Sequence, residues 1–96
     1  MPDKTFTLKI VTPEEEIFNS EVVSVVVPGT GGSFGVLANH APLISQVEYG
    51  IVSAMLPDGS EVVVDQRGGY VKVKDNEMVL LASSATIEAE VSGVPR

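Results

Sequence analysis

Short apolar segments rich in β-branched residues, separated by turn residues, recur along most of the chain and strongly limit its fold. In the segment FTLKIVT, Phe6, Leu8 and Ile10 alternate with more polar residues, the period-two pattern of a strand with one buried face. The segment EVVSVVV is dense in β-branched residues, which favours strand over helix. We therefore expect about eight to ten short strands in an all-β sandwich or barrel.

Turn residues divide these segments. Pro28 and Gly29 are expected to end the EVVSVVV strand, and PDGS further on to form a tight turn. ISQVEYGIVSAML is interpreted as two strands that meet near Gly50. Gly68 and Gly69 indicate a sharp bend or bulge between EVVVD and YVKVK.

The end of the chain departs from this pattern. In SSATIEAEV, Ile87 and Val91 are spaced by about one helical turn, and Ser92-Gly93 follows. We expect a short helical or frayed extension there.

Length and charge exclude several classes. The 96 residues make one domain, and the absence of cysteine excludes a disulfide framework or a thiolate zinc site. A net charge of -7 argues against electrostatic binding to nucleic acid or to an anionic membrane. No apolar run has the roughly 20 residues of a membrane span, and MPDKTFTLKI does not resemble a secretory signal. We expect an acidic protein of cytosolic type.

The stretch GTGGSFGVLANHAPL contains the single histidine and is the strongest candidate for a site. His40 has no recognisable nucleophile motif beside it, so catalysis is disfavoured. One histidine and the acidic run Glu14 to Glu16 do not match the ligand spacing of a metal site. The glycines do not fit a dinucleotide fingerprint, and no helix is expected after them to bind phosphate.

The same glycines can instead shape a tight loop. Such a loop would present Ser33 and Phe34, with Phe34 either exposed as an apolar contact or buried. From the residues alone, the prediction is a β-sandwich interaction module with no catalytic residue, metal site or cofactor site.

Three ordered segments resemble a known family. LKIVTPEEEIF, GSFGVLANHAPLIS and GGYVKVKDNEMVLLASSA are similar to the epsilon subunit of F-type rotary ATP synthases, whose mitochondrial counterpart is called delta. The resemblance covers roughly residues 5 to 87 and implies an N-terminal β-sandwich, or flattened barrel, of two antiparallel sheets. It further implies a non-catalytic central-stalk subunit that binds the gamma subunit along one side of the sandwich and the polar loops of the c-ring at one end. Such a subunit would couple ion-driven rotation to ATP synthesis, act indirectly on the alpha/beta head, and bind neither nucleic acid nor a cofactor.

The resemblance also implies sites and a location. The c-ring contact would comprise Thr30, Gly31, Gly32, Ser33 and Phe34. The gamma contact would comprise Thr12, His40, Ala41, Pro42, Leu43 and Ser45. The subunit would lie peripherally on the cytoplasmic, stromal or matrix face of the energy-transducing membrane, without inserting into it.

Two departures from the family pattern affect these expectations. Members often have an acidic residue at the position of Ser33, and most continue into two C-terminal helices. Here we expect a domain over 1–87 and a short tail over 88–96, too short for a helical hairpin. The alternatives are a short natural form and a truncated chain, and SGVPR resembles the remnant of a tag-cleavage site. We therefore assign neither ATP binding nor an inhibitory helical conformation.

Other functions stay open on the residues alone. A free-standing β-sandwich adaptor is the main alternative. A small hydrolase using His40 and a sugar- or nucleotide-binding sandwich are further ones, although two Tyr, three Phe and no Trp offer few stacking surfaces.

Overall fold

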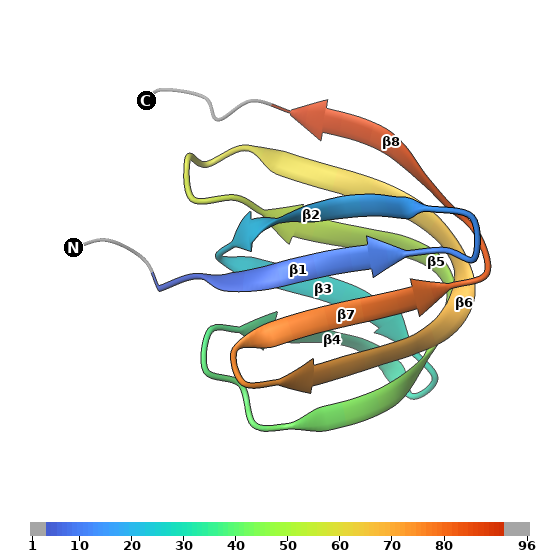
Figure 1. Cartoon of the computed structure of the whole chain (residues 1–96), viewed down its shortest axis with the longest axis horizontal. Coiled ribbons are helices and arrows are strands. Elements are labelled where there is room, and N and C mark those ends of the chain that lie inside the picture. The colour runs from blue at the N-terminus through green and yellow to red at the C-terminus, as the bar shows by residue number, and fades with distance from the viewer. Residues whose placement is uncertain (1–3, 92–96) are drawn as a thin grey trace.

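A computed structural model describes residues 4–91, which form eight β-strands and no helix (Figure 1). The all-β prediction and the expected number of strands are confirmed. The strands are β1 (Phe6–Val11), β2 (Glu16–Val22), β3 (Ser24–Gly29), β4 (Gly32–Leu37), β5 (Leu43–Met55), β6 (Glu61–Lys74), β7 (Glu77–Ala82) and β8 (Ala85–Val91). Residues 1–3 and 92–96 lie outside the described part, so the expectation for SGVPR falls there.

Two long strands join the layers of the sandwich. β5 and β6 have 13 and 14 residues, and both bend near their middle and continue in the other layer (Figure 1). Layer 1 contains β2, β1 and β7 with the second half of β6 and the first half of β5. Layer 2 contains β4 and β3 with the second half of β5, the first half of β6, and β8. Strands that change sheet through a bend form the corners of such sandwiches.

The bends fall where the sequence places glycines. The predicted bend at Gly68 and Gly69 is confirmed, and both residues have positive φ, 65° and 150°. A Cβ on Gly69 would lie 1.8 Å from the Leu81 carbonyl oxygen, so the backbone of β7 approaches too closely for any side chain. The segment around Gly50 is one bent strand, β5, instead of two separate strands.

The core lies between the two layers. Phe6, Leu8 and Ile10 of β1 are buried, as their alternation predicts. Valines from β3, β5 and β6 supply much of the remaining interior. Gln66 is also fully buried, at the bend of β6.

One strand pairing and one strand boundary differ from the expectation. β1 pairs with β7 in parallel, so the sheets are mixed, whereas all other pairs are antiparallel. Alternation along a strand indicates which of its faces is buried, but it does not identify the strand that pairs with it. The break between β2 and β3 falls at Val23, inside the run that we interpreted as one strand, and β3 continues through Pro28 to Gly29.

The predicted helical or frayed extension is wrong, because residues 85–91 form strand β8. β8 pairs antiparallel with the first half of β6, from Glu61↔Val91 to Gln66↔Ala85. A helix this short is marginal in water, whereas the free edge of β6 offers a ladder of backbone hydrogen bonds.

Candidate interaction surfaces

The glycine-rich stretch forms a β-hairpin with a two-residue turn. Gly29 of β3 pairs with Gly32 of β4, and only Thr30 and Gly31 lie between the strands. Gly32 has a φ of 125°, which glycine adopts readily, and Thr30, Gly31, Gly32 and Ser33 are all exposed. The predicted ring-contact residues are therefore together at one end of the hairpin: Thr30 and Gly31 form the turn, and Gly32, Ser33 and Phe34 begin strand β4.

Phe34 supports this hairpin from within. It is half-buried and packs against the core cluster. Its ring lies 2.9 Å from the place that a Cβ on Gly29 would occupy. Of the two possibilities that the sequence left open, the structure places the ring mostly against the molecule, so only its outer part can meet a partner.

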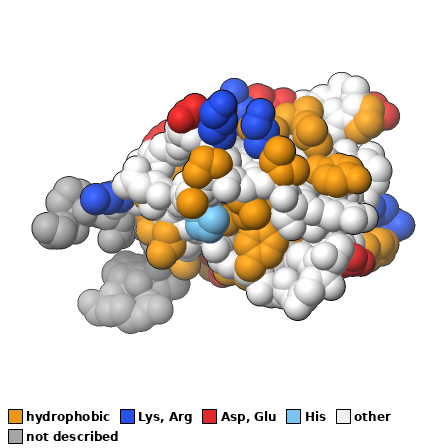
Figure 2. All heavy atoms as spheres, turned by 90° about the horizontal axis from the view of Figure 1, so that it is seen from below, with side chains coloured by type: hydrophobic (Ala, Val, Ile, Leu, Met, Phe, Trp, Pro, Cys, Tyr) orange, Lys and Arg blue, Asp and Glu red, His pale blue; other side chains and the backbone are white. Residues whose placement is uncertain are grey.

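Residues 37–44, which we call the His40 surface, comprise the last residue of β4, the loop over residues 38–42 and the first two residues of β5. Leu37 and Ile44 are 62% and 73% exposed, and Figure 2 shows the single histidine surrounded by apolar side chains. His40 itself is half-buried, and its Nδ1 lies 2.7 Å from the Ala41 carbonyl oxygen, the one hydrogen bond of the imidazole within residues 4–91. A ring held this way helps to shape the surface.

An asparagine from another turn holds the loop. Asn39, with φ 63°, donates its backbone N–H to Asn76 Oδ1 at 2.8 Å. Asn76 Nδ2 in turn donates to the Thr5 carbonyl at 2.9 Å. The His40 surface is thus joined to the β6–β7 turn and to the start of β1.

Four of the predicted gamma-contact residues follow one another in this surface, and Ser45 comes two positions later. Ala41 and Pro42 are exposed, whereas Leu43 and Ser45 are half-buried on β5. The Ser45 hydroxyl donates to the Gln46 carbonyl at 3.2 Å.

Thr12 lies elsewhere. It is only 7% exposed, in a turn where its N–H donates to the Glu15 carbonyl at 2.9 Å. Strand β1 lies between this turn and Thr5, and Asn76 connects Thr5 to the His40 loop. The length of an extended strand therefore places Thr12 about 20 Å from the end of the sandwich that carries the His40 loop. The structure does not bring Thr12 together with the other predicted gamma-contact residues.

These residues define two ends of the sandwich (Figure 1). The bend end contains the β1–β2 and β3–β4 turns, the bends of β5 and β6, and the β7–β8 connection; its residues are 12–15, 30–31, 48–50, 66–69 and 83–84. The loop end contains the His40 loop and the β5–β6 and β6–β7 turns; its residues are 37–42, 57–60 and 75–76.

The bend end includes a pair that the sequence reasoning missed. Tyr49 and Arg67 are register partners across β5 and β6, and the guanidinium carbon of Arg67 lies 4.9 Å from the centroid of the Tyr49 ring. The isolated sequence shows an aromatic residue before Gly50 and a cation before Gly68, but only the pairing of the bent strands brings them together.

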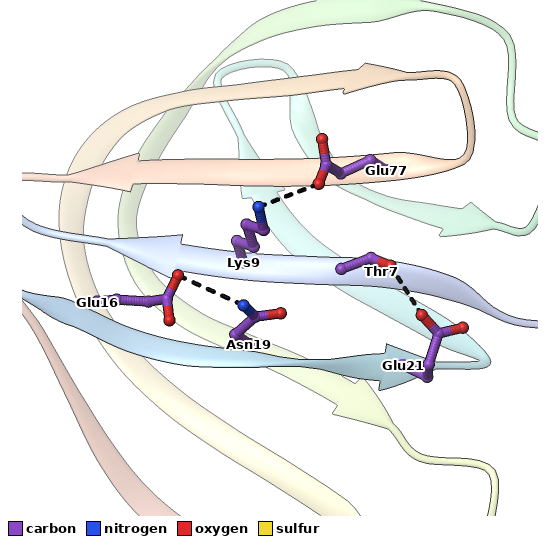
Figure 3. A network of polar contacts seen from close by, with 6 residues as sticks. All are labelled: Thr7, Lys9, Glu16, Asn19, Glu21 and Glu77. Atoms are coloured by element: carbon purple, nitrogen blue, oxygen red, sulfur yellow. Dashed lines mark hydrogen bonds and ion pairs between the residues drawn. The ribbon is translucent and has the colours of Figure 1, made fainter.

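The outer face of layer 1 is polar and internally bonded (Figure 3). Lys9 Nζ lies 3.3 Å from Glu77 Oε2, and the Glu21 carboxylate accepts bonds of 2.7 Å from the hydroxyls of Thr5 and Thr7. These two hydroxyls lower the pKa of Glu21 below its ordinary value.

A second carboxylate with a lowered pKa lies in the β5–β6 turn. Asp58 Oδ1 accepts the backbone N–H of Ser60 at 2.8 Å and the Ser60 hydroxyl at 2.5 Å. The hydroxyl is the larger cause of the lowered pKa of Asp58, and the backbone N–H adds to it.

Residues 4–91 also bear on a metal site and on a membrane span. No group of three His, Cys, Asp or Glu residues is placed to hold a metal ion there. No helix of that part of the chain is long and apolar enough to cross a membrane.

Comparison with known proteins identifies a family. Residues 5–88 match the sequence model described as ATP synthase, Delta/Epsilon chain, beta-sandwich domain. The chain is 42% identical over 91 residues to the ATP synthase epsilon chain of Pelotomaculum thermopropionicum, covering 95% of this chain and 67% of that protein. Over 84 residues it is also 42% identical to the epsilon chain of Chlorobaculum tepidum, covering 88% of this chain and 96% of that shorter protein.

A solved structure has the same fold. A chain of the Euglena gracilis mitochondrial ATP synthase, in a structure of OSCP, F1 and the c-ring, matches 91% of this chain with a TM-score of 0.83 and 21% identity. The match covers 56% of that chain, and the present chain likewise spans 61% of the epsilon chain of Desulfitobacterium hafniense.

Proposed function

The chain belongs to the delta/epsilon family of ATP synthase subunits, and on this basis we propose that it is a non-catalytic rotor subunit that connects the gamma subunit to the c-ring. The match of nearly the whole described sandwich to that family is the observation that carries the proposal. In the assembled enzyme the subunit would be peripheral to the membrane.

The hairpin turn at the bend end is the proposed ring contact. Thr30 and Gly31 project beyond the paired strands, and a Cβ on Gly31 would meet no atom within 4 Å. A narrow tip of this kind can enter between the polar loops of a ring. Ser33 offers a hydroxyl and no charge there, so shape would contribute more than an ion pair at this position.

The His40 surface is the proposed gamma contact. Its exposed apolar side chains, Leu37 and Ile44 among them, are the kind that form the centre of a stable protein interface. Thr12 stays in the proposal as a separate contact, which gamma would reach only by extending along the sandwich to the bend end.

The fold suits a part that transmits rotation. β5 and β6 run between the two ends and through both layers, and the core between them is densely packed. A force applied at the hairpin would therefore be transferred to the His40 surface through continuous strands. This mechanism requires rigidity and two contact surfaces, with no chemistry in the subunit itself.

The test uses Gly31→Arg, which adds a long side chain where the structure has open space. Pro57→Arg adds the same side chain to an exposed turn at the loop end. In vesicles with the reconstituted enzyme, we expect Gly31→Arg to lower proton-driven ATP synthesis several-fold and Pro57→Arg to leave it near the unmodified level. Unchanged synthesis with Gly31→Arg, at an unchanged melting temperature, would contradict the ring contact.

His40→Ala tests the rest of the proposal. We expect weaker binding of gamma in a titration and no loss of any enzymatic activity of the isolated chain. A hydrolytic activity that disappears in His40→Ala would favour the hydrolase alternative, and normal binding of gamma by His40→Ala would remove the histidine from the contact.

A further inference from the structure

Tyr49 and Arg67 form an exposed pair that the fold assembles before any partner arrives. Tyr49 is 60% exposed although it is a large aromatic residue, and the guanidinium of Arg67 lies over its ring. Because the two residues are directly opposed across β5 and β6, the sheet itself sets this geometry. Side chains ordered in advance lose less conformational entropy when they bind.

The backbone beneath the pair is held from the core. Gln66 is fully buried, and its Nε2 donates to the carbonyls of Glu48 at 2.5 Å and of Gly50 at 3.2 Å, which are the residues on either side of Tyr49. Gln66 Oε1 has no hydrogen-bond partner within residues 4–91, a costly arrangement for a buried oxygen. The side-chain amide of Gln66 therefore holds the bend of β5 in place, while its unpaired oxygen lowers the stability of the fold.

Arg67 is held from the other side. Its backbone N–H donates to the Ser84 carbonyl at 2.9 Å, and its carbonyl accepts the Ser83 hydroxyl. Both residues of the pair consequently lie on backbone that is fixed to neighbouring strands and loops.

The pair lies beside the hairpin. A Cβ on Gly50 would be 3.4 Å from the Pro28 ring, and Gly29 pairs with Val47. The bend that exposes Tyr49 therefore packs on the strand that leads to the Thr30–Gly31 turn. The two features can meet one partner at the same time.

We propose that Tyr49 and Arg67 form a second contact with the ring loops and determine the specificity of that contact, an inference that rests on the proposed function. Tyrosine and arginine, together with tryptophan, are enriched among the residues that contribute most of the binding energy of interfaces. The Arg67 side chain makes no hydrogen bond within residues 4–91, so its N–H groups are available to oxygen acceptors, carbonyl or carboxylate, of a ring loop.

Charge around the pair sharpens this assignment. Within the described part of the chain, Arg67 is the one cation of the bend end, and Glu14, Glu15 and Glu48 are acidic there. A loop that fits this end would place an oxygen acceptor against Arg67 and avoid carboxylates elsewhere. A ring with the acceptor at another position would lose the Arg67 contact, which is how the pair distinguishes rings.

The experiment measures binding of the full chain to the purified c-ring of the same organism in nanodiscs, with ring-free nanodiscs of the same anionic lipids as a second arm. The variants are Tyr49→Ala, Arg67→Ala and the double variant. Tyr70→Ala is the matched control, because Tyr70 is 57% exposed and its register partners, Gln46 on β5 and Leu81 on β7, lie outside the bend end. Thermal unfolding of each variant confirms that the fold is kept.

We expect each single variant to bind the ring about tenfold more weakly, and the double variant to lose less than the product of the two effects, because the residues act as a pair. Tyr70→Ala should bind like the unmodified chain. Binding of Tyr49→Ala and Arg67→Ala at the level of Tyr70→Ala, while Gly31→Arg still weakens binding, would overturn this inference and leave the proposed function standing. No binding of the ring by the unmodified chain would overturn both. Loss of binding to the ring-free nanodiscs in the Arg67→Ala variant would identify lipid as the occupant and also overturn the inference.

Discussion

The bend end and the loop end of the sandwich reverse the chain by different physical means. At the bend end, Gly50, Gly68 and Gly69 take positive φ, and the buried amide of Gln66 donates hydrogen bonds to the carbonyls of Glu48 and Gly50. At the loop end, Asn39, Asp75 and Asn76 take positive φ with φ values between 54° and 63°, and side chains at the surface bond the backbone.

The difference determines how each end tolerates change. The backbone of β7 leaves no space for a side chain at Gly69, so the shape of the bend depends on a residue that lacks a Cβ and on the fully buried Gln66. The loop end depends on exposed hydrogen bonds that can be weakened one at a time. A rigid bend end would keep the shape of the hairpin turn fixed against the ring. The locally adjustable His40 loop would let the apolar His40 surface fit the surface of gamma.

Gly69→Ala should have the largest effect. The new Cβ would collide with the Leu81 carbonyl, 1.8 Å away, at a φ of 150° that alanine disfavours. We expect a loss of at least about 3 kcal/mol in urea unfolding, enough to leave a small domain partly unfolded. Gly31→Ala, in open space, should stay within about 0.5 kcal/mol of the unmodified chain. Equal stability of the two variants would show that the bend end is not tightly packed.

Gln66→Glu should have the next largest effect. At neutral pH a buried carboxylate would face the Glu48 and Gly50 carbonyl oxygens, and we expect a loss of about 3 kcal/mol. Burial raises the pKa of such a carboxyl, so the loss grows as the pH rises above about 4.3, the value for an unfolded Glu, and disappears below it.

Gln46→Glu is the control for this variant, because Gln46 is exposed on the same strand that Gln66 supports. It should unfold like the unmodified chain at every pH above 5. A pH-independent effect of Gln66→Glu would mean that the side chain at this position is reached by water and does not hold the bend.

Asn76→Ala tests the loop end and should cost about 2 kcal/mol. It removes two hydrogen bonds, to Asn39 and Thr5, and places alanine at a φ of 62°. Asn76→Gly keeps the backbone conformation and should cost about half as much, since only the hydrogen bonds are lost. If the glycine variant is as unstable as the alanine variant, backbone strain contributes nothing at this turn.

Asp58→Asn should have the smallest effect. The Ser60 hydrogen bonds lower the pKa of Asp58 in the folded state, so the charged carboxylate stabilises the fold above its ordinary value of 3.8. This contribution is lost as the pH falls through the lower, folded-state pKa. The small difference in melting temperature between the two proteins should therefore be constant from pH 5 to 7 and shrink below about pH 3.8. A difference that increases on acidification would contradict the assigned direction.

The faces of the strands could be predicted from the sequence, but most of their partners could not. Alternation identified the buried side of β1, and the glycine pair identified the bend of β6. The parallel pairing of β1 with β7 joins segments about 70 residues apart, and no local pattern encodes it. β8 was missed for the same reason, because its strand depends on a free edge that exists only after β6 has folded.

The candidate sites likewise divide into residues that a local sequence motif predicts and residues that only long-range pairing brings together. The motif around His40 is continuous in sequence, so its predicted residues fall together in the His40 surface. Thr12 was assigned to the same contact, and only the length of β1 reveals that it lies at the other end. The Tyr49–Arg67 pair and the buried Gln66 depend on long-range register and burial, which the isolated residues do not show.

The absence of cysteine from the chain allows the most direct test of the two-ended account. Thr30→Cys and Ala41→Cys each introduce a single thiol at an exposed position, one at the bend end and one at the loop end. In the assembled ATP synthase, a short thiol-directed crosslinker should join position 30 to the c-ring and position 41 to gamma. Crosslinks of position 30 to gamma and of position 41 to the ring, or of neither position to either partner, would contradict the account.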